Sequence, residues 1–215
     1  MAESLRKELK RPDQFVQTGK RWLEWGVQHR STMLAGAGTL LVVLLAVGGV
    51  YSYREANLRQ ANADLAAALT TMQEERWVEA ARQMEEVAER WGGGVGDTAR
   101  LYAAQAQLKT GNLDGAAATL EAALASSLPG YLRQQALFNL GFVAEQKGDA
   151  KAAAERYAEA SAAGGPFTGP ALLAEARLRL DLGDAESAKG LYRRYLEEFP
   201  EAADRTTIEA RLGEI

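Results

Sequence analysis

The chain has 215 residues, of which 47% are hydrophobic and 25% are charged, and its formal net charge is −4 at pH 7. It contains no cysteine, which excludes a disulfide framework, a thiolate metal site and a lipid-modified N-terminal cysteine. The whole chain contains one histidine, so it offers only one candidate of the side-chain type that most often acts as a general acid or base.

Residues 1–30 are predicted to form a basic amphipathic segment at a membrane surface. Apolar side chains recur there near helical spacing, with charged residues between them. Two of them, Trp22 and Trp25, have rings suited to a membrane–water interface, where the apolar body is buried and the N–H stays wet. We therefore expect Trp22, Trp25, Arg30 and Arg54 to lie at the interface. A specific cytoplasmic docking site is the alternative interpretation of this segment.

Residues 31–53 are predicted to be a transmembrane helix. They form a run of 23 uncharged residues, which as a helix would be about 34 Å long and could cross a bilayer. The rival interpretation is a cleaved secretory signal, which has a short basic start and an apolar region of roughly 7 to 15 residues. Here 30 residues precede the apolar run. A retained anchor fits both lengths better.

The charges on either side of this run predict its orientation. Residues 1–30 carry seven Lys and Arg, whereas the 20 residues after the run carry two. Because positive charge is retained on the cytoplasmic side, we place residues 1–30 in the cytoplasm and residues 54–215 outside it. Residues 54–215 have a net charge of −7, which argues against nucleic acid as a partner and against tight adhesion to anionic lipid.

Beyond the apolar run, residues 54–60 are expected to be a linker and residues 61–215 a helical domain. Strong helix formers dominate, and no alternating Val, Ile and Thr stretch indicates a strand, so the predicted fold is all-α. Gly111, Gly148 and Gly183 each precede a polar residue and lie 37 and 35 residues apart. A period of this length is typical of a solenoid of helical hairpins.

The third period carries the most specific pattern. Residues 137–142 read Leu-Phe-Asn-Leu-Gly-Phe, and Gly148-Asp149 and Tyr157 follow in the positions of a turn and of a second helix. This unit resembles the tetratricopeptide repeat. The resemblance implies a solenoid of about four repeats and a capping helix near residues 202–212. The first repeat is weaker, because Glu75 replaces the turn glycine.

Two further segments depart from the repeat pattern. Glu175 and Arg179 stand where the repeat has apolar residues, so either they pair at i, i+4 or the register is off by about one residue there. The run 92–98 contains four glycines. It lacks the lysine of a phosphate-binding loop and is predicted to be a linker between repeats.

The overall plan is similar to that of the ancillary subunit of the SecYEG translocon and of repeat domains in cell-division coordinators. Residues 20–24, Lys-Arg-Trp-Leu-Glu, resemble the basic and tryptophan-containing approach to the span in that family. The resemblance implies a protein of the bacterial inner membrane whose periplasmic domain binds translocon subunits, periplasmic chaperones or emerging chains. A scaffold for cell-envelope assembly or cell division is the alternative. Repeats of this kind often self-associate, which leaves a homo-oligomer open.

We expect no enzyme activity, no cofactor and no metal site. His29 lies beside the apolar run, without a carboxylate cluster near it in the sequence. Glu85, Glu86 and Glu89 alternate with apolar residues on a predicted helix, so we interpret them as its solvated face and not as metal ligands.

The resemblance also implies a partner-binding groove lined by the first helix of each repeat. A large exposed apolar surface usually binds protein, so we expect this groove to hold an apolar or amphipathic segment. The alternative is that its side chains are buried within the solenoid or covered by the segment that follows the span. The expected lining residues are Leu65, Leu69, Met72, Leu101, Leu108, Phe138, Phe142 and Leu173.

Overall fold

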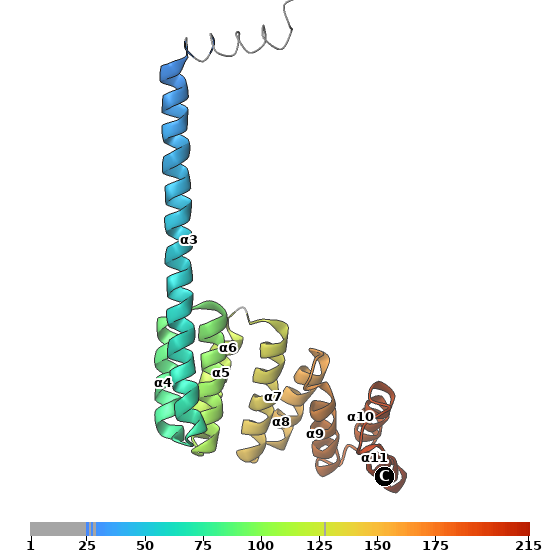
Figure 1. Cartoon of the computed structure of the whole chain (residues 1–215). Helices are drawn as coiled ribbons and strands as arrows, with labels where there is room; N and C mark the ends of the chain where they lie inside the picture. Colours follow the sequence, from blue (N-terminus) through green and yellow to red (C-terminus); the bar gives the residue numbers. More distant parts are fainter. Residues whose placement is uncertain (1–24, 26, 28, 127) are drawn as a thin grey trace, which may run out of the picture. The chain divides into compact units, whose positions relative to one another are not determined.

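The computed structural model describes residues 25, 27, 29–126 and 128–215. In these ranges the chain forms nine helices and no strand, which confirms the predicted all-α class (Figure 1). The chain divides after Leu58 into two compact units.

The first unit contains most of helix α3 (Arg30–Gln73). By length and composition this helix is apolar enough to cross a membrane, and the side chains of its most apolar stretch are not buried. Tyr51 and Tyr53, 69% and 68% exposed, lie at the end of that stretch, just before Arg54. Residues 54–60, where a linker is expected, are helical and belong to α3.

The second unit, from Arg59 onward, is a stack of four helical hairpins with one further helix at its end. The last turns of α3 form the first hairpin with α4. The other elements are α4 (Trp77–Arg90), α5 (Gly93–Lys109), α6 (Leu113–Leu124), α7 (Gly130–Gln146), α8 (Ala150–Ala162), α9 (Thr168–Asp181), α10 (Ala185–Glu198) and α11 (Arg205–Glu214). Ile208 of α11 is buried against α10, as expected of a cap. The predicted hairpin solenoid is therefore confirmed.

The turns within the hairpins follow from local sequence. Gly111, Gly148 and Gly183 have φ values of 75°, 81° and 80°, a left-handed conformation that glycine adopts without strain. Glu75 takes the same conformation in the first hairpin, with φ of 58°. After each glycine, a side-chain oxygen accepts the backbone N–H three residues further on and so caps the next helix. These capping residues are Asn112, Asp149 and Asp184.

Small residues let the helices of each hairpin approach closely, and one large side chain fills the remaining gap. A Cβ at Gly141 would lie 2.8 Å from the ring of Tyr157, so this ring packs directly on the backbone of α7. Tyr157 is 2% exposed, and Leu120 and Tyr192 occupy the same place in their hairpins at 0% and 1%. This is the close packing that the repeat pattern predicts.

The glycine run at 92–98 is not a linker. Helix α5 begins at Gly93, inside the run, and continues through it. A Cβ at Gly96 would lie 1.9 Å from the carbonyl oxygen of Trp91, so only glycine fits where α5 approaches the end of α4. The glycines here permit a close helix contact and do not mark a flexible connection.

The question of register in the fourth hairpin is resolved by an ion pair. Arg179 Nη2 lies 3.3 Å from Glu175 Oε1, one helical turn away. Glu175 is only 6% exposed. Its burial raises the pKa of the Glu175 carboxyl, and the hydrogen bond from Arg179 opposes that shift.

Candidate partner-binding surface

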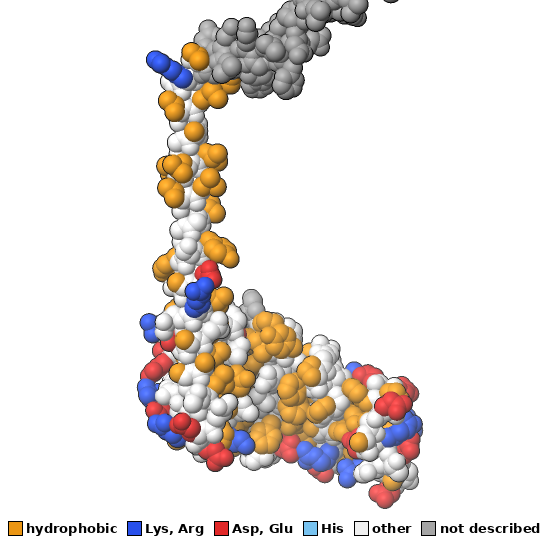
Figure 2. Space-filling view, in the orientation of Figure 1, with side chains coloured by type: hydrophobic (Ala, Val, Ile, Leu, Met, Phe, Trp, Pro, Cys, Tyr) orange, Lys and Arg blue, Asp and Glu red, His pale blue; other side chains and the backbone are white. Residues whose placement is uncertain are grey.

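The first helices of the hairpins, α5, α7 and α9, contribute most of the apolar side chains on one face of the stack. Figure 2 shows these side chains gathered over the three helices, with charged side chains mainly towards the edges of the view. We call this the inner face. The groove expected from the sequence would lie on these same first helices and remains a prediction.

The predicted lining residues differ in their access to solvent. Phe142 is 40% exposed and is available to a partner. Leu101 is 3% exposed and packs in the core with Leu120 and Leu140, so it cannot line a groove. The other predicted residues are half-buried against the cores of the stack, so only part of each side chain is accessible to solvent. They are Leu65, Leu69, Met72, Leu108, Phe138 and Leu173.

The most accessible part of the inner face is one side of α7. Tyr131, Gln135, Phe138 and Phe142 follow one another at intervals of four, three and four residues, so they share one side of the helix. Tyr131 is 62% exposed. Sequence reasoning missed Tyr131, although its spacing from Phe138 is the signal that could have identified it.

Phe138 anchors this side of α7 to the next hairpin. Its ring centroid lies 5.2 Å from that of Tyr157 in α8 and 5.1 Å from that of Phe167 before α9. Tilted aromatic pairs at these distances are favourable beyond the area they bury. The exposed ring of Phe142 lies one turn further along the same side of α7, so it extends from a rigid base.

A polar network borders the aromatic side chains. Glu145 Oε1 accepts a hydrogen bond from Arg177 of α9 at 2.7 Å, and its Oε2 accepts one from the Tyr157 hydroxyl at 3.2 Å. One carboxylate thus connects three helices. Burial, followed by the charge of Glu145, raises the pKa of Tyr157. Arg177 also lies 3.9 Å from Asp181, so it is shared between two carboxylates.

The described residues expected at a membrane interface belong to the first unit. Trp25 is 49% exposed, and its ring stacks on that of His29 at 4.9 Å. Arg30 and Arg54 are exposed at the two ends of the apolar run of α3. Trp22 lies outside the described residues.

The carboxylates considered as metal ligands are used in other contacts. Glu85 accepts a hydrogen bond from Gln107 at 2.6 Å, and Glu86 forms an ion pair with Arg82. Across residues 29–126 and 128–215, and at 25 and 27, no group of three or more His, Asp or Glu side chains is placed to hold a metal ion.

Comparison with known proteins identifies the repeat. The family model of the tetratricopeptide repeat matches residues 65–131, 103–167 and 173–208. No curated protein matches the chain.

Solved structures show the same fold. A tetratricopeptide repeat protein from Parabacteroides merdae ATCC 43184 superposes with a TM-score of 0.61 at 15% identity, over 71% of this chain and 58% of that one. PilW, described as a widely conserved type IV pilus biogenesis factor, gives 0.57 at 17% identity, over 69% of this chain and 66% of PilW. MamA gives 0.56 at 18% identity, over 66% of this chain and 79% of MamA. This chain therefore spans less than two thirds of the Parabacteroides protein and of PilW.

Proposed function

Because this chain belongs to the tetratricopeptide-repeat family, we propose that it is a noncatalytic protein-interaction module tethered to the bacterial inner membrane. Proteins of this family generally act as scaffolds that bind other proteins. In this proposal, residues 1–30 lie in the cytoplasm, residues 31–53 cross the membrane, and the hairpin stack lies in the periplasm. The observation that carries the proposal is the exposed aromatic side of α7, with Phe142 and Tyr131 at 40% and 62% exposure.

The chemistry of the inner face supports capture of an apolar or amphipathic segment. Exposed aromatic rings on a rigid element are typical anchors of protein interfaces, since they bury a large area and lose little conformational entropy on binding. Arg177 is shared between Glu145, at 2.7 Å, and Asp181, at 3.9 Å, so the polar border of the inner face has ion pairs of its own. A charged segment would have to compete with these pairs, whereas an apolar segment would not.

The sequence around α3 supports the tether and its direction. The run of 23 uncharged residues ends with Tyr51 and Tyr53 and is followed by Arg54, and these residue types favour a membrane–water interface. Seven Lys and Arg precede the run, which favours a cytoplasmic N-terminus.

We propose translocon subunits, periplasmic chaperones or emerging chains as the partners of the inner face. The test is photo-crosslinking of the full-length protein in intact membranes, with a photoreactive residue at position 142 and mass spectrometry of the products. Recovery of channel subunits, chaperones or secreted chains supports a role at the translocon. Recovery of division or wall-synthesis proteins supports the alternative, a structural scaffold. Products formed only between copies of this chain would show that the inner face is an oligomer contact.

A pair of matched variants separates binding from folding. With the photoreactive residue moved to position 131, Phe142→Asp should abolish capture and leave thermal unfolding little altered, because the ring is already partly in water. Val78→Asp is the control, since Val78 is 75% exposed on α4 and does not belong to the inner face. Equal loss of crosslinks in both variants, or collapse of the fold on changing Phe142, would contradict the proposal.

A further inference from the structure

The helix ends of the stack lie at two opposite edges. The turns inside the hairpins lie at one edge, which we call the turn edge (Figure 1). The joints between hairpins, after α4, α6 and α8, lie at the other, which we call the joint edge. Trp91, after α4, donates from Nε1 to Asp64 Oδ2 of α3 at 2.8 Å, and Ser126, after α6, donates to Asp97 Oδ1 of α5 at 3.2 Å. The joint after α8 is bonded to Gln134 of α7.

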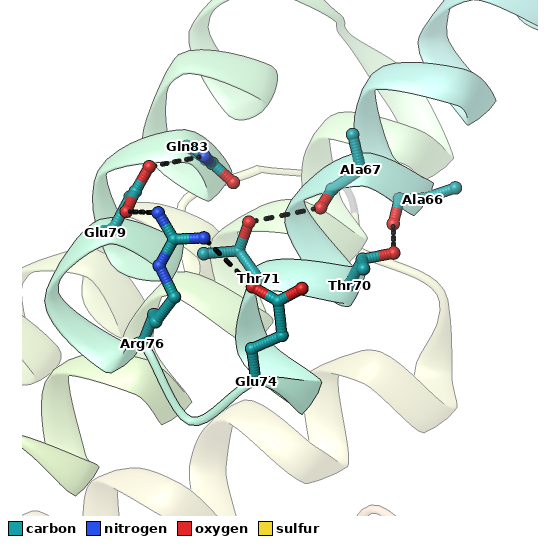
Figure 3. A network of polar contacts seen from close by, with 8 residues as sticks. All are labelled: Ala66, Ala67, Thr70, Thr71, Glu74, Arg76, Glu79 and Gln83. Carbon is teal, nitrogen blue, oxygen red and sulfur yellow. Dashed lines mark hydrogen bonds and ion pairs between the residues drawn. The ribbon is translucent and has the colours of Figure 1, made fainter.

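The two edges differ in charge. The three joints lie in sequence runs that contain no Asp, Glu, Lys or Arg. These runs are 91–96, 122–132 and 160–174. The four turns lie in segments that each carry two to four charged side chains. These segments are 74–79, 109–114, 145–151 and 181–186. At the first turn, Figure 3 shows Arg76 between Glu74, at 2.9 Å, and Glu79. The turn edge is therefore ionic and the joint edge is not.

The exposed residues of the joint edge are small or amphipathic. They include the glycines at 92–94, Pro129 and Pro166. Tyr131, which is 62% exposed in the first turn of α7, lies at the corner between this edge and the inner face. Tyrosine is enriched at membrane–water interfaces, where its ring is buried and its hydroxyl stays hydrated. Such an edge can meet a bilayer surface without loss of hydration from a charged group.

The chain holds the joint edge close to the end of the apolar run. The bond between Asp64 and Trp91 shows that α3 enters the stack at this edge. Tyr53 ends the apolar run, and Arg59, six positions later, begins the second unit. These residues are helical in α3, so they cover about 9 Å. The headgroup layer of a bilayer is itself roughly 5 to 8 Å thick on each side. A tether this short gives the edge a high local concentration beside the bilayer.

We propose that the joint edge rests on the periplasmic surface of the membrane that carries the span, a contact that depends on the tether of the proposed function. The glycines, the prolines and Tyr131 contact the headgroup layer. The acidic side chains of the turn edge lie on the opposite side of the stack, so the net charge of −7 on residues 54–215 does not oppose the contact. The inner face then extends outward from the membrane surface.

The test is fluorescence quenching of the full-length chain in phosphatidylcholine vesicles that contain lipid with a nitroxide on its headgroup. Because the chain has no cysteine, a single introduced cysteine can carry the fluorophore. Ala125→Cys and Ala163→Cys label the joint edge, and Thr110→Cys and Lys147→Cys label the turn edge. All four are exposed residues at the C-terminal ends of helices, so they are matched in local structure. Helix α5, of 17 residues, separates the edges by about 25 Å. We expect quenching at positions 125 and 163 and none at 110 and 147.

A label at position 52 separates this proposal from the proposed function. Ser52 is exposed near the end of the apolar run, so the label of Ser52→Cys should be quenched whenever the run spans the bilayer. Quenching at 52 without quenching at 125 and 163 would overturn the edge contact and leave the tether in place. Absence of quenching at 52 would overturn the tether, and the edge contact with it. Equal quenching at both edges would show that the stack lies flat on the bilayer and would also contradict the proposal.

Added charge tests the chemistry of the contact. Gly94→Glu combined with Pro129→Glu places two carboxylates on the joint edge, and quenching at position 163 should fall, because a charge loses hydration at the bilayer surface. Gln73→Glu combined with Gln146→Glu is the control, since it adds the same charge to exposed positions at the turn edge and should leave quenching unchanged. Quenching in the parent chain should persist in about 1 M salt, which screens charges beyond about 3 Å. Its loss in salt would show that charged side chains hold the edge, and would refute the proposal.

Discussion

Replacing Gln134 with leucine tests what holds the third hairpin to the fourth. Gln134 is 0% exposed on α7. Its Nε2 donates to the carbonyl oxygen of Ala160 and to the hydroxyl of Thr168, both at 3.1 Å, and its Oε1 accepts the backbone N–H of Phe167 at 3.1 Å. One amide therefore ties α7 to the end of α8 and to the start of α9.

The expected loss of stability can be worked from these contacts. Each hydrogen bond contributes about 1 kcal/mol net, and the groups left without a partner add a desolvation penalty of about 1 kcal/mol or more. Leucine has nearly the same size and regains about 1 kcal/mol by burial of its side chain. The Gln134→Leu variant should therefore lose about 3 kcal/mol of unfolding free energy. For a domain of this size, this corresponds to a fall in Tm of roughly 6 to 12 °C.

The measurement is urea unfolding of the full-length protein in detergent micelles, followed by circular dichroism, together with hydrogen exchange. Exchange in α9 and α10 should rise more than exchange in α5, because each hairpin contacts only its neighbours. Gln135→Leu is the matched control, since Gln135 is the adjacent amide and is only half-buried. Gly165→Ala should also destabilise, because its Cβ would lie 2.6 Å from Gln134 Oε1. A Gln134→Leu variant within about 0.5 kcal/mol of the parent chain would refute this account.

Three further changes test other contacts. Glu175→Gln should stabilise the protein at pH 7, because burial raises the folded pKa of the Glu175 carboxyl. The parent chain regains stability as the pH falls through that folded pKa. The difference in unfolding free energy between variant and parent, measured by urea unfolding, should therefore vanish near the ordinary pKa of about 4.3. Gly96→Ala should lower the unfolding free energy by about 3 kcal/mol or more, because its Cβ would lie 1.9 Å from a carbonyl oxygen. Gly190→Ala is the control, since its Cβ would have open space around it and should cost no stability. Both are measured by thermal unfolding. Tyr195→Phe removes the 2.6 Å hydrogen bond to Asp204 and should cost about 1 kcal/mol, with faster hydrogen exchange in α11. Its hydroxyl, with a pKa of about 12, stays un-ionised at neutral pH.

The parts of the fold that could be predicted from sequence are those decided within a few residues. Gly111, Gly148 and Gly183 marked their turns because a left-handed residue followed by an Asx cap is a purely local arrangement. The run 92–98 was misinterpreted as a linker. Its glycines indicate a flexible segment by propensity, but α5 begins inside the run, and Gly96 packs on the carbonyl oxygen of Trp91, five residues earlier, which propensity alone does not reveal.

The inner face was predictable only in outline. The repeat pattern places both Leu101 and Phe142 on the first helices of their hairpins. It does not indicate how much of each side chain is buried by the neighbouring helices. Leu101 is covered and Phe142 is not.

The turns within the hairpins and the joints between hairpins depend on different bonds. Asn112, Asp149 and Asp184 each cap a helix of their own hairpin, so the turn of each hairpin is determined by that hairpin's own sequence. The joint between the third and fourth hairpins instead depends on Gln134 and Glu145, each of which bonds to the fourth hairpin as well as to its own. Duplication of a whole hairpin during evolution would keep its turn intact, but a copy inserted at this joint would need new side chains on both sides. The same holds at the joint between the first and second hairpins, where Gln107 of α5 donates to Glu85 of α4.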